Sequence, residues 1–188
     1  KGPEVMMSVA GYVGFDRSLT DADAQGLQNF AKLCVRAGVT TVTDLASRLS
    51  DETVEMMENI TSAEDFPARL VPLKFFIGLS PKDLAARVRE LAKRSTDRLR
   101  LGKIKIVADG SIQGFSARMR WPGYYNGAPN GLWYITPEQL SEIYHLALQA
   151  GVQVHTHTNG DQAIDLALEM LGPALKAHPH RDHRFTLQ

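Results

Sequence analysis

One stretch decides the fold of this chain: Val152-Gln153-Val154-His155-Thr156-His157-Thr158-Asn159-Gly160-Asp161. Its first six residues alternate at the two-residue period of a β-strand, which places the valines and Thr156 on one face and His155 and His157 on the other. Gly160 then turns the chain into a helix. Imidazoles at the carboxyl end of a strand, just before a helix, are typical of the active site of an α/β barrel. Hydrogen-bonded core histidines are the alternative.

Composition places the chain among globular proteins with a core of their own. Its 188 residues are 44% apolar and 22% charged, which suits one domain. The charges of the 21 basic and 21 acidic side chains cancel, so the net charge does not favour nucleic acid or an anionic membrane as a partner. No apolar run approaches the roughly 20 residues of a membrane span. The single cysteine, Cys34, excludes an internal disulfide and favours a cytoplasmic location.

Helices and strands alternate outward from this stretch. The strongest helix start is Thr136-Pro137-Glu138-Gln139, a capping box with proline in the first turn, and Gly151 ends that helix. Other helices are expected to start at Thr20, Ser50, Ser80 and Asp161. Strands are expected at residues 39–45, 69–77, 103–109, 152–157 and 183–188.

This alternation predicts a parallel sheet with right-handed crossovers. A Gly-x-Gly-x-x-Gly fingerprint and a phosphate loop are both missing from the sequence, which disfavours nucleotide-binding folds. We therefore expect an α/β fold, the central portion of a (β/α)8 TIM-type barrel, with a doubly wound sheet as second choice. Because the chain starts at Lys1 and stops at Gln188 inside an apparent strand, residues 1–188 are expected to be a fragment covering about strands 2 to 6.

Lys105 lies on a strand face that it shares with Lys103 and Asp109, and burying an unpaired lysine is costly. Three interpretations remain open. Lys105 is a structural lysine paired with an acid, a Schiff-base nucleophile of the aldolase type, or a lysine that reacts with carbon dioxide to give an anionic carbamate. A carbamate oxygen beside imidazole nitrogen would suit zinc and several other divalent ions.

His157 is the best candidate for a metal ligand, because it lies at the carboxyl end of its strand, where the active sites of α/β barrels collect. His155 shares its face but lies two residues deeper. Asp161 either orients a ligand histidine or caps the following helix. The histidine-rich segment 177–183 is interpreted as a polar helix–strand loop rather than a metal tract.

The long segment 111–135 carries two tryptophans and two of its three tyrosines side by side, among several glycines and prolines. Long loops after barrel strands commonly shape substrate pockets. We expect an inserted aromatic loop on the substrate side of the barrel. The alternative is a surface loop whose aromatic side chains pack on the rest of the fold.

Two motifs carry a resemblance to a known family. Lys105-Ile106-Val107-Ala108-Asp109-Gly110-Ser111 resembles the Lys-x-x-x-Asp-Gly-Ser segment of the YtcJ-like branch of the amidohydrolase superfamily (amidohydrolase family 3), which includes N-substituted formamide deformylases. His157-Thr158-Asn159-Gly160-Asp161-Gln162-Ala163-Ile164-Asp165 is similar to the next motif of that branch. The lead-in Asp182-His183-Arg184-Phe185-Thr186-Leu187-Gln188 and the strand near Gly38 also fit, in order and at matching spacing.

The resemblance implies a metal-dependent amidohydrolase that cleaves an amide or formamide C–N bond of a small molecule. It implies one or two divalent ions, zinc by default, with Lys105 as a carboxylated ligand and His157 as a histidine ligand. His155 is a further candidate ligand. Asp109 and Asp161 are carried over as groups that assist catalysis. Bound metal in such enzymes activates water and polarises the scissile carbonyl.

The family's remaining ligands would lie outside this sequence: a His-x-His before Lys1, and a histidine and a catalytic aspartate beyond Gln188. The 188 residues alone are therefore expected to bind metal poorly and to be inactive. Two other functions stay open. One is a Schiff-base aldolase using Lys105, and the other is a non-catalytic binding or regulatory barrel module, which the aromatic loop suggests.

Overall fold

The structure, a computed structural model, describes residues 23–188. Its centre is a five-stranded sheet in which every pair of neighbours is parallel. The strands lie side by side in the order in which they occur in the chain. They are β1 Thr41–Ser47, β2 Arg69–Phe75, β3 Lys103–Val107, β4 Gln153–His157 and β5 Thr186–Leu187.

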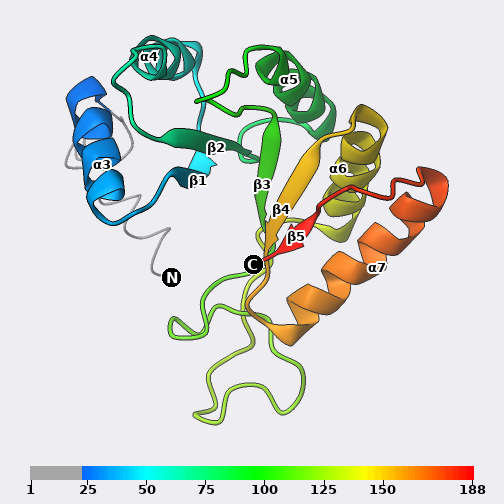
Figure 1. Ribbon diagram of the computed structural model, residues 1–188. Helices are drawn as coiled ribbons and strands as arrows, with labels where there is room; N and C mark the ends of the chain where they lie inside the picture. The colour runs from blue at the N-terminus through cyan, green and yellow to red at the C-terminus, as the bar shows by residue number, and fades with distance from the viewer. Residues whose placement is uncertain (1–22) are drawn as a thin grey trace.

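The described helices form an arc around one side of this sheet (Figure 1). They are α3 Ala24–Arg36, α4 Asp51–Thr61, α5 Pro81–Lys93, α6 Pro137–Ala150 and α7 Asp161–Ala177. Sequential strand order with the helices on one side is the arrangement of a (β/α)8 barrel segment. A doubly wound sheet has helices on both faces. The barrel expectation is thus confirmed.

Most element boundaries follow the local signals. Ser50 and Ser80 accept hydrogen bonds at the starts of α4 and α5. Thr136 and Gln139 form the expected capping box, and Gly151 ends α6 in the left-handed conformation, with φ 65°. These side chains and glycines satisfy backbone groups that a helix end leaves unpaired. The start expected at Thr20 lies outside the described residues.

Several expected boundaries were wrong by a few residues: β2 ends at Phe75 rather than at residue 77, β3 ends at Val107 rather than at residue 109, and β4 begins at Gln153 rather than at residue 152. α7 begins at Asp161, as expected, but the alternative that Asp161 caps this helix was wrong, because the cap residue is Gly160.

The first strand begins at Thr41 rather than at residue 39, because Gly38 has a φ of +74° and the N–H of Val39 bonds to α3. The last strand is only Thr186–Leu187, because Arg184 has a positive φ, which interrupts an extended chain.

Apolar side chains fill the space between sheet and helices. Ile104, Ile106 and Val154 are fully buried against α5, α6 and α7, together with Tyr144. A second cluster joins α3 and α4 to residues such as Leu70. Because side chains alternate along a strand, the opposite face of β3 and β4 carries the polar residues. The core thus fixes which side chains are available for chemistry.

Candidate active site

The candidate site lies on the face of β3 and β4 that points away from the helices. In the parallel register, Lys103 is paired with Gln153 and Lys105 with His155. Val107 is paired with His157 one step further along. The structure therefore brings the predicted lysine and both predicted histidines onto adjacent strands of one face.

Both ring nitrogens of His155 face side-chain nitrogens of glutamines, and a neutral ring accepts a hydrogen bond from one of them. Its Nε2 lies 3.0 Å from Nε2 of Gln153, and its Nδ1 lies 2.9 Å from Nε2 of Gln188. The oxygens of the same two amides accept hydrogen bonds from Lys103 and Lys105. Burial, with added repulsion from both lysines, lowers the pKa of His155. The environment therefore favours the neutral ring, in which one nitrogen accepts a hydrogen bond from a glutamine amide.

His157 has a simpler environment at the carboxyl end of β4. Its Nε2 lies 3.0 Å from the side-chain nitrogen of Asn159, which also donates to the carbonyl of Gly110 at 2.9 Å. An amide N–H donating to Nε2 places the ring proton on Nδ1 in the neutral form. Of the two histidines, His157 is the one whose ring keeps a nitrogen without a side-chain partner in the described part of the chain.

Lys105 is 5% exposed and hydrogen-bonds to the neutral amide of Gln188. No carboxylate between residues 23 and 188 forms an ion pair with it. Burial alone lowers the pKa of its ammonium group. The interpretation of Lys105 as a structural lysine paired with an acid therefore finds no support among the described residues.

Asp109 is fully buried and accepts three backbone hydrogen bonds. Its Oδ2 accepts from the N–H of Arg118 at 2.9 Å and of Gly160 at 2.8 Å, and its Oδ1 from the N–H of Asn159 at 2.9 Å. Backbone donors are suitable partners for a buried carboxylate. The side chain joins the end of β3 to the turn after β4, which carries Asn159 and follows His157.

Asp161 makes its contacts away from the histidines. Its Oδ1 accepts hydrogen bonds from the N–H groups of Arg120 at 2.7 Å and of Gln162 at 2.9 Å. The Arg120 side chain pairs with Asp165, one turn further along α7. Asp161 thus fastens segment 111–135 to the start of α7 instead of orienting a histidine.

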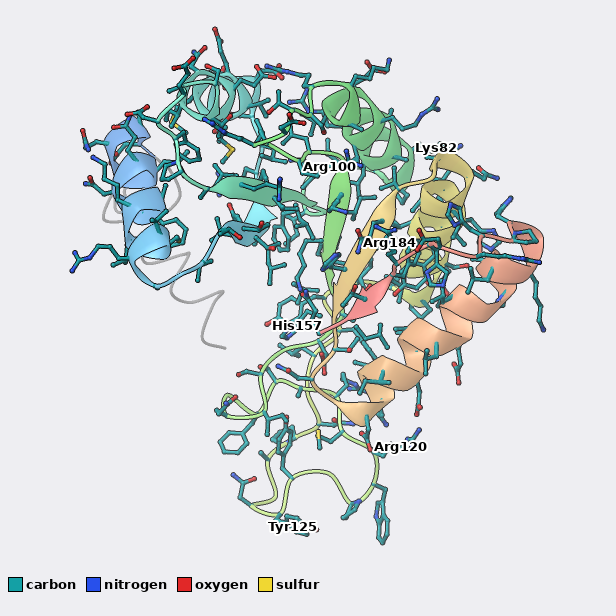
Figure 2. The ribbon with its side chains drawn as sticks, viewed as in Figure 1. Lys82, Arg100, Arg120, Tyr125, His157 and Arg184 are labelled. Carbon is teal, nitrogen blue, oxygen red and sulfur yellow. The ribbon has the colours of Figure 1, made fainter. Side chains whose placement is uncertain are left out.

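Segment 111–135 is a long loop whose aromatic residues behave in two ways. Trp121 and Tyr125 are 93% and 101% exposed, and Figure 2 shows Tyr125 at the far tip of the loop. Tyr124 instead donates to the carbonyl of Ala117 at 2.9 Å, and the Arg118 guanidinium lies 5.0 Å from the centre of the Trp133 ring. The base of the loop is packed and its tip extends into solvent.

Gly160 is required by a close approach between this loop and the turn after β4. A Cβ at this position would overlap the backbone of Arg118. The N–H of Gln162 also donates to the Arg118 carbonyl at 3.2 Å. The loop is therefore anchored beside the strand end that carries His157.

The donor types suit a divalent metal, but the described residues supply only part of a set. Imidazole and a carbamate oxygen are ligands that zinc and related ions accept. Within residues 23–188, however, no group of three or more His, Cys, Asp or Glu residues is arranged to hold a metal ion. His157 and a carboxylated Lys105 could therefore serve only together with further ligands.

Sequence reasoning missed Asn159 and the two glutamines beside His155. Asn159 lies within the motif that includes His157, and its spacing of two residues was the available signal. The glutamines at 153 and 188 carried no such signal, because their roles depend on pairing between β3, β4 and β5.

Together, the fold and the site define a class: a section of an α/β barrel with polar groups gathered at the carboxyl ends of its strands. The chain belongs to the amidohydrolase family, whose model matches residues 6–188. The described helices include none that is long and apolar enough to cross a bilayer.

Relatives agree with this membership. The protein LONG AFTER FAR-RED 3 of Arabidopsis thaliana is 28% identical over 176 residues, which cover 89% of this chain and 30% of that protein. YtcJ of Bacillus subtilis (strain 168), which bears the name of an amidohydrolase, is 31% identical over 98 residues, covering 52% of this chain and 18% of YtcJ. The resemblance to the YtcJ-like branch is thus confirmed.

Solved structures share the fold. An uncharacterized metal-dependent hydrolase from Pyrococcus furiosus matches with a TM-score of 0.64 at 19% identity, covering 80% of this chain and 31% of that one. A triazine hydrolase from Arthobacter aurescens matches with a TM-score of 0.53 at 13% identity, covering all of this chain and 42% of that one. The chain thus spans less than half the length of each of these relatives and structures.

Proposed function

We propose that this chain contributes Lys105 and His157 to the metal centre of a hydrolase that cleaves amide or formamide C–N bonds of small molecules. Membership of the amidohydrolase family supports the reaction class. The assignment of the site rests on the environment of Lys105. Its amine is buried beside two imidazoles and has no acid partner among the described residues.

A buried ammonium group without a counter-ion is unstable, so Lys105 gains from becoming a neutral amine. A neutral amine can add to the carbon of carbon dioxide. The N–C bond forms, one C=O bond opens to an oxygen anion, and the nitrogen releases one proton to solvent. The product is a carbamate, whose oxygens are hard ligands at the level of His155 and one step from His157.

The other residues would position this site. Asn159 fixes the His157 ring, and Asp109 fixes the backbone of Asn159. Asp161 holds the loop 111–135 beside the strand ends, where that loop can shape the space for a substrate. A bound divalent ion, zinc by default, would supply Lewis-acid chemistry that acidifies water and polarises a carbonyl. His155 stays a candidate ligand, but it would first have to give up a glutamine contact.

The test combines metal analysis, amide hydrolysis and magnetic resonance on the complete protein. Lys105→Met and His157→Ala are expected to lose bound metal and hydrolysis, and Lys82→Met, a change of an exposed lysine on α5, to retain both. With isotopically labelled bicarbonate, a carbamate carbon signal should appear in the unaltered protein and vanish in Lys105→Met. Full activity in Lys105→Met would contradict the proposal. A carbamate signal that persists in Lys105→Met would contradict it as well.

The lowered pKa of Lys105 is also what a Schiff-base lysine requires. An aldolase is therefore the second candidate function. Borohydride reduction in the presence of carbonyl substrates would attach the substrate to Lys105 if this candidate is correct. Absence of any adduct, together with the carbamate signal, would leave the hydrolase as the function.

A further inference from the structure

A polar cavity lies at the opposite end of the strands from His157. It encloses about 380 Å³ where β3 and β4 begin, and the segment before β5 closes one side. In Figure 2 Arg100 lies where β3 starts, and His157 lies at the far end of β4. Gln153 and His157 are four residues apart on β4, about 13 Å at the rise of a strand. This cavity is therefore centred at the opposite end of the strands from His157, although it shares Lys103 and Gln153 with the polar face described above.

The cavity is lined by an excess of cations. Arg89, Lys93, Arg100, Lys103 and Arg184 contribute basic side chains, and Asp182 contributes the one acid among the lining residues. Asp182 is already paired with Arg184 at 2.7 Å, and Lys93 is paired with Glu90, outside the lining, at 2.8 Å. The other three lining cations form no ion pair with a described residue.

The unpaired cations act on one another. Among the described residues, the Lys103 ammonium group hydrogen-bonds only to the neutral amide oxygen of Gln153, and Arg89 and Arg100 line the same cavity without an acidic partner. Side chains of like charge repel unless an anion lies between them. An anion bound among these cations would reduce their mutual repulsion.

Two histidines add neutral donors to the same wall. Nδ1 of His180 accepts the N–H of Asp182 at 3.2 Å, and Nδ1 of His183 accepts the N–H of Phe185 at 2.9 Å. A neutral ring that accepts at Nδ1 carries its proton at Nε2. Both residues line the cavity, so each adds an N–H donor to a wall already rich in cations.

We propose that this cavity binds the phosphate group of a small anion. Guanidinium groups bind phosphate through paired N–H donors, and lysine adds a point charge. The volume lies within the usual range for small-molecule sites and leaves room for an organic group esterified to the phosphate. The proposal does not depend on the hydrolytic function proposed above, because the cavity is not lined by Lys105, His155 or His157.

Isothermal titration calorimetry of the complete protein at low ionic strength tests this site. Inorganic phosphate and phenyl phosphate are titrated separately. Arg100→Gln and Arg184→Gln are each expected to weaken binding by about tenfold, the usual effect of losing a charged hydrogen-bond donor. Asp182→Asn is expected to tighten binding severalfold, because it removes the anion that competes for Arg184. Tighter binding of phenyl phosphate would identify an organic phosphate as the ligand.

Arg36→Gln is the matched control, since it removes an exposed arginine at the end of α3, away from the cavity. It should bind phosphate as the unaltered chain does. Circular dichroism confirms that each variant is folded, and either arginine variant suffices for the comparison. Equal phosphate affinity in the unaltered chain, Arg100→Gln and Arg184→Gln, or no measurable binding of either probe, would overturn the proposal.

Discussion

Oδ2 of Asp109 lies 2.8 Å from the backbone nitrogen of Gly160, although 51 residues separate the two in the chain. The same carboxylate also accepts the N–H groups of Arg118 and Asn159. One buried side chain therefore fixes the strand end of β3, the base of the loop 111–135 and the turn after β4. The positions of His157 and of the loop both depend on it.

Asp109→Ala should therefore lower the free energy of unfolding by about 3 kcal/mol or more, because it leaves buried N–H donors without an acceptor. Urea denaturation measures this change. Asp65→Ala, at an exposed position between α4 and β2, should change stability by less than about 0.5 kcal/mol. If both variants unfold at the same urea concentration, the carboxylate does not join these segments as described.

Tyr144 predicts a loss of stability at alkaline pH. Burial raises its pKa to about 12, and its hydroxyl is hydrogen-bonded to Thr156 at 2.8 Å. In the unfolded chain the phenol ionises near pH 10, so above that pH the native state binds more protons. The contribution of Tyr144 is thus present below pH 10 and is lost, by about 2 kcal/mol, as the pH rises towards 12.

Tyr144→Phe should remove that alkaline loss and should cost about 1 kcal/mol at neutral pH, since Thr156 loses its partner. Unfolding free energies measured from pH 8 to about 12 show both effects. Tyr125→Phe is the control, because the Tyr125 side chain is fully exposed. A similar alkaline slope in Tyr144→Phe and in the unaltered chain would show that the Tyr144 phenol is not responsible.

Asp161 is expected to hold the loop rather than to react with a substrate. Asp161→Ala should raise hydrogen exchange at the Arg120 amide, since that N–H loses its acceptor. Asp165→Ala removes a more exposed ion pair with Arg120 and should have a smaller effect. Exchange at Arg120 that is unchanged in Asp161→Ala would argue for a different role of this carboxylate.

Asn159 is expected to act through His157. In the complete protein, Asn159→Ala should weaken metal binding by about tenfold, as partners that orient a ligand histidine commonly do. Asn126→Ala, at the exposed end of the loop, should leave metal binding unchanged. Tighter metal binding in Asn159→Ala would instead show that Asn159 competes with metal for Nε2 of His157.

The 188-residue chain by itself is expected to retain substoichiometric zinc after dialysis. The reason is that no group of three or more ligand-type residues gathers within residues 23–188, whereas zinc usually takes about four ligands. Elemental analysis after dialysis against buffer gives the answer. Stoichiometric zinc together with amide hydrolysis would show that these residues form a complete site.

The local features of the fold could be predicted because their causes lie within a few residues. The caps at Ser50 and Ser80 and the capping box at Thr136 each depend on side chains next to the helix they start. The polar face of β4 followed from alternation alone. The placement of Lys105 beside His155 then followed from the regular order of the parallel strands.

The roles of the two aspartates could not be predicted in the same way. Asp109 and Asp161 were expected to assist catalysis, which stays a prediction, and the sequence did not indicate that their hydrogen bonds go to backbone groups of the loop and of the turn after β4. Those groups come close only after the loop folds back over the strand ends. Gly160 was predicted as a turn residue, but its close approach to Arg118 depends on the same long-range contact.

The order of the strands also has a consequence for synthesis on the ribosome. Each strand from β2 onward pairs with the one made just before it, so a growing chain always offers the next strand a finished neighbour. The hydrogen bonds of the Asp109 carboxylate form later than the strand pairing, because its partners Asn159 and Gly160 are translated about fifty residues after it. Their arrival would lock the loop and the strand end that carries His157 late, once the scaffold beneath them has formed.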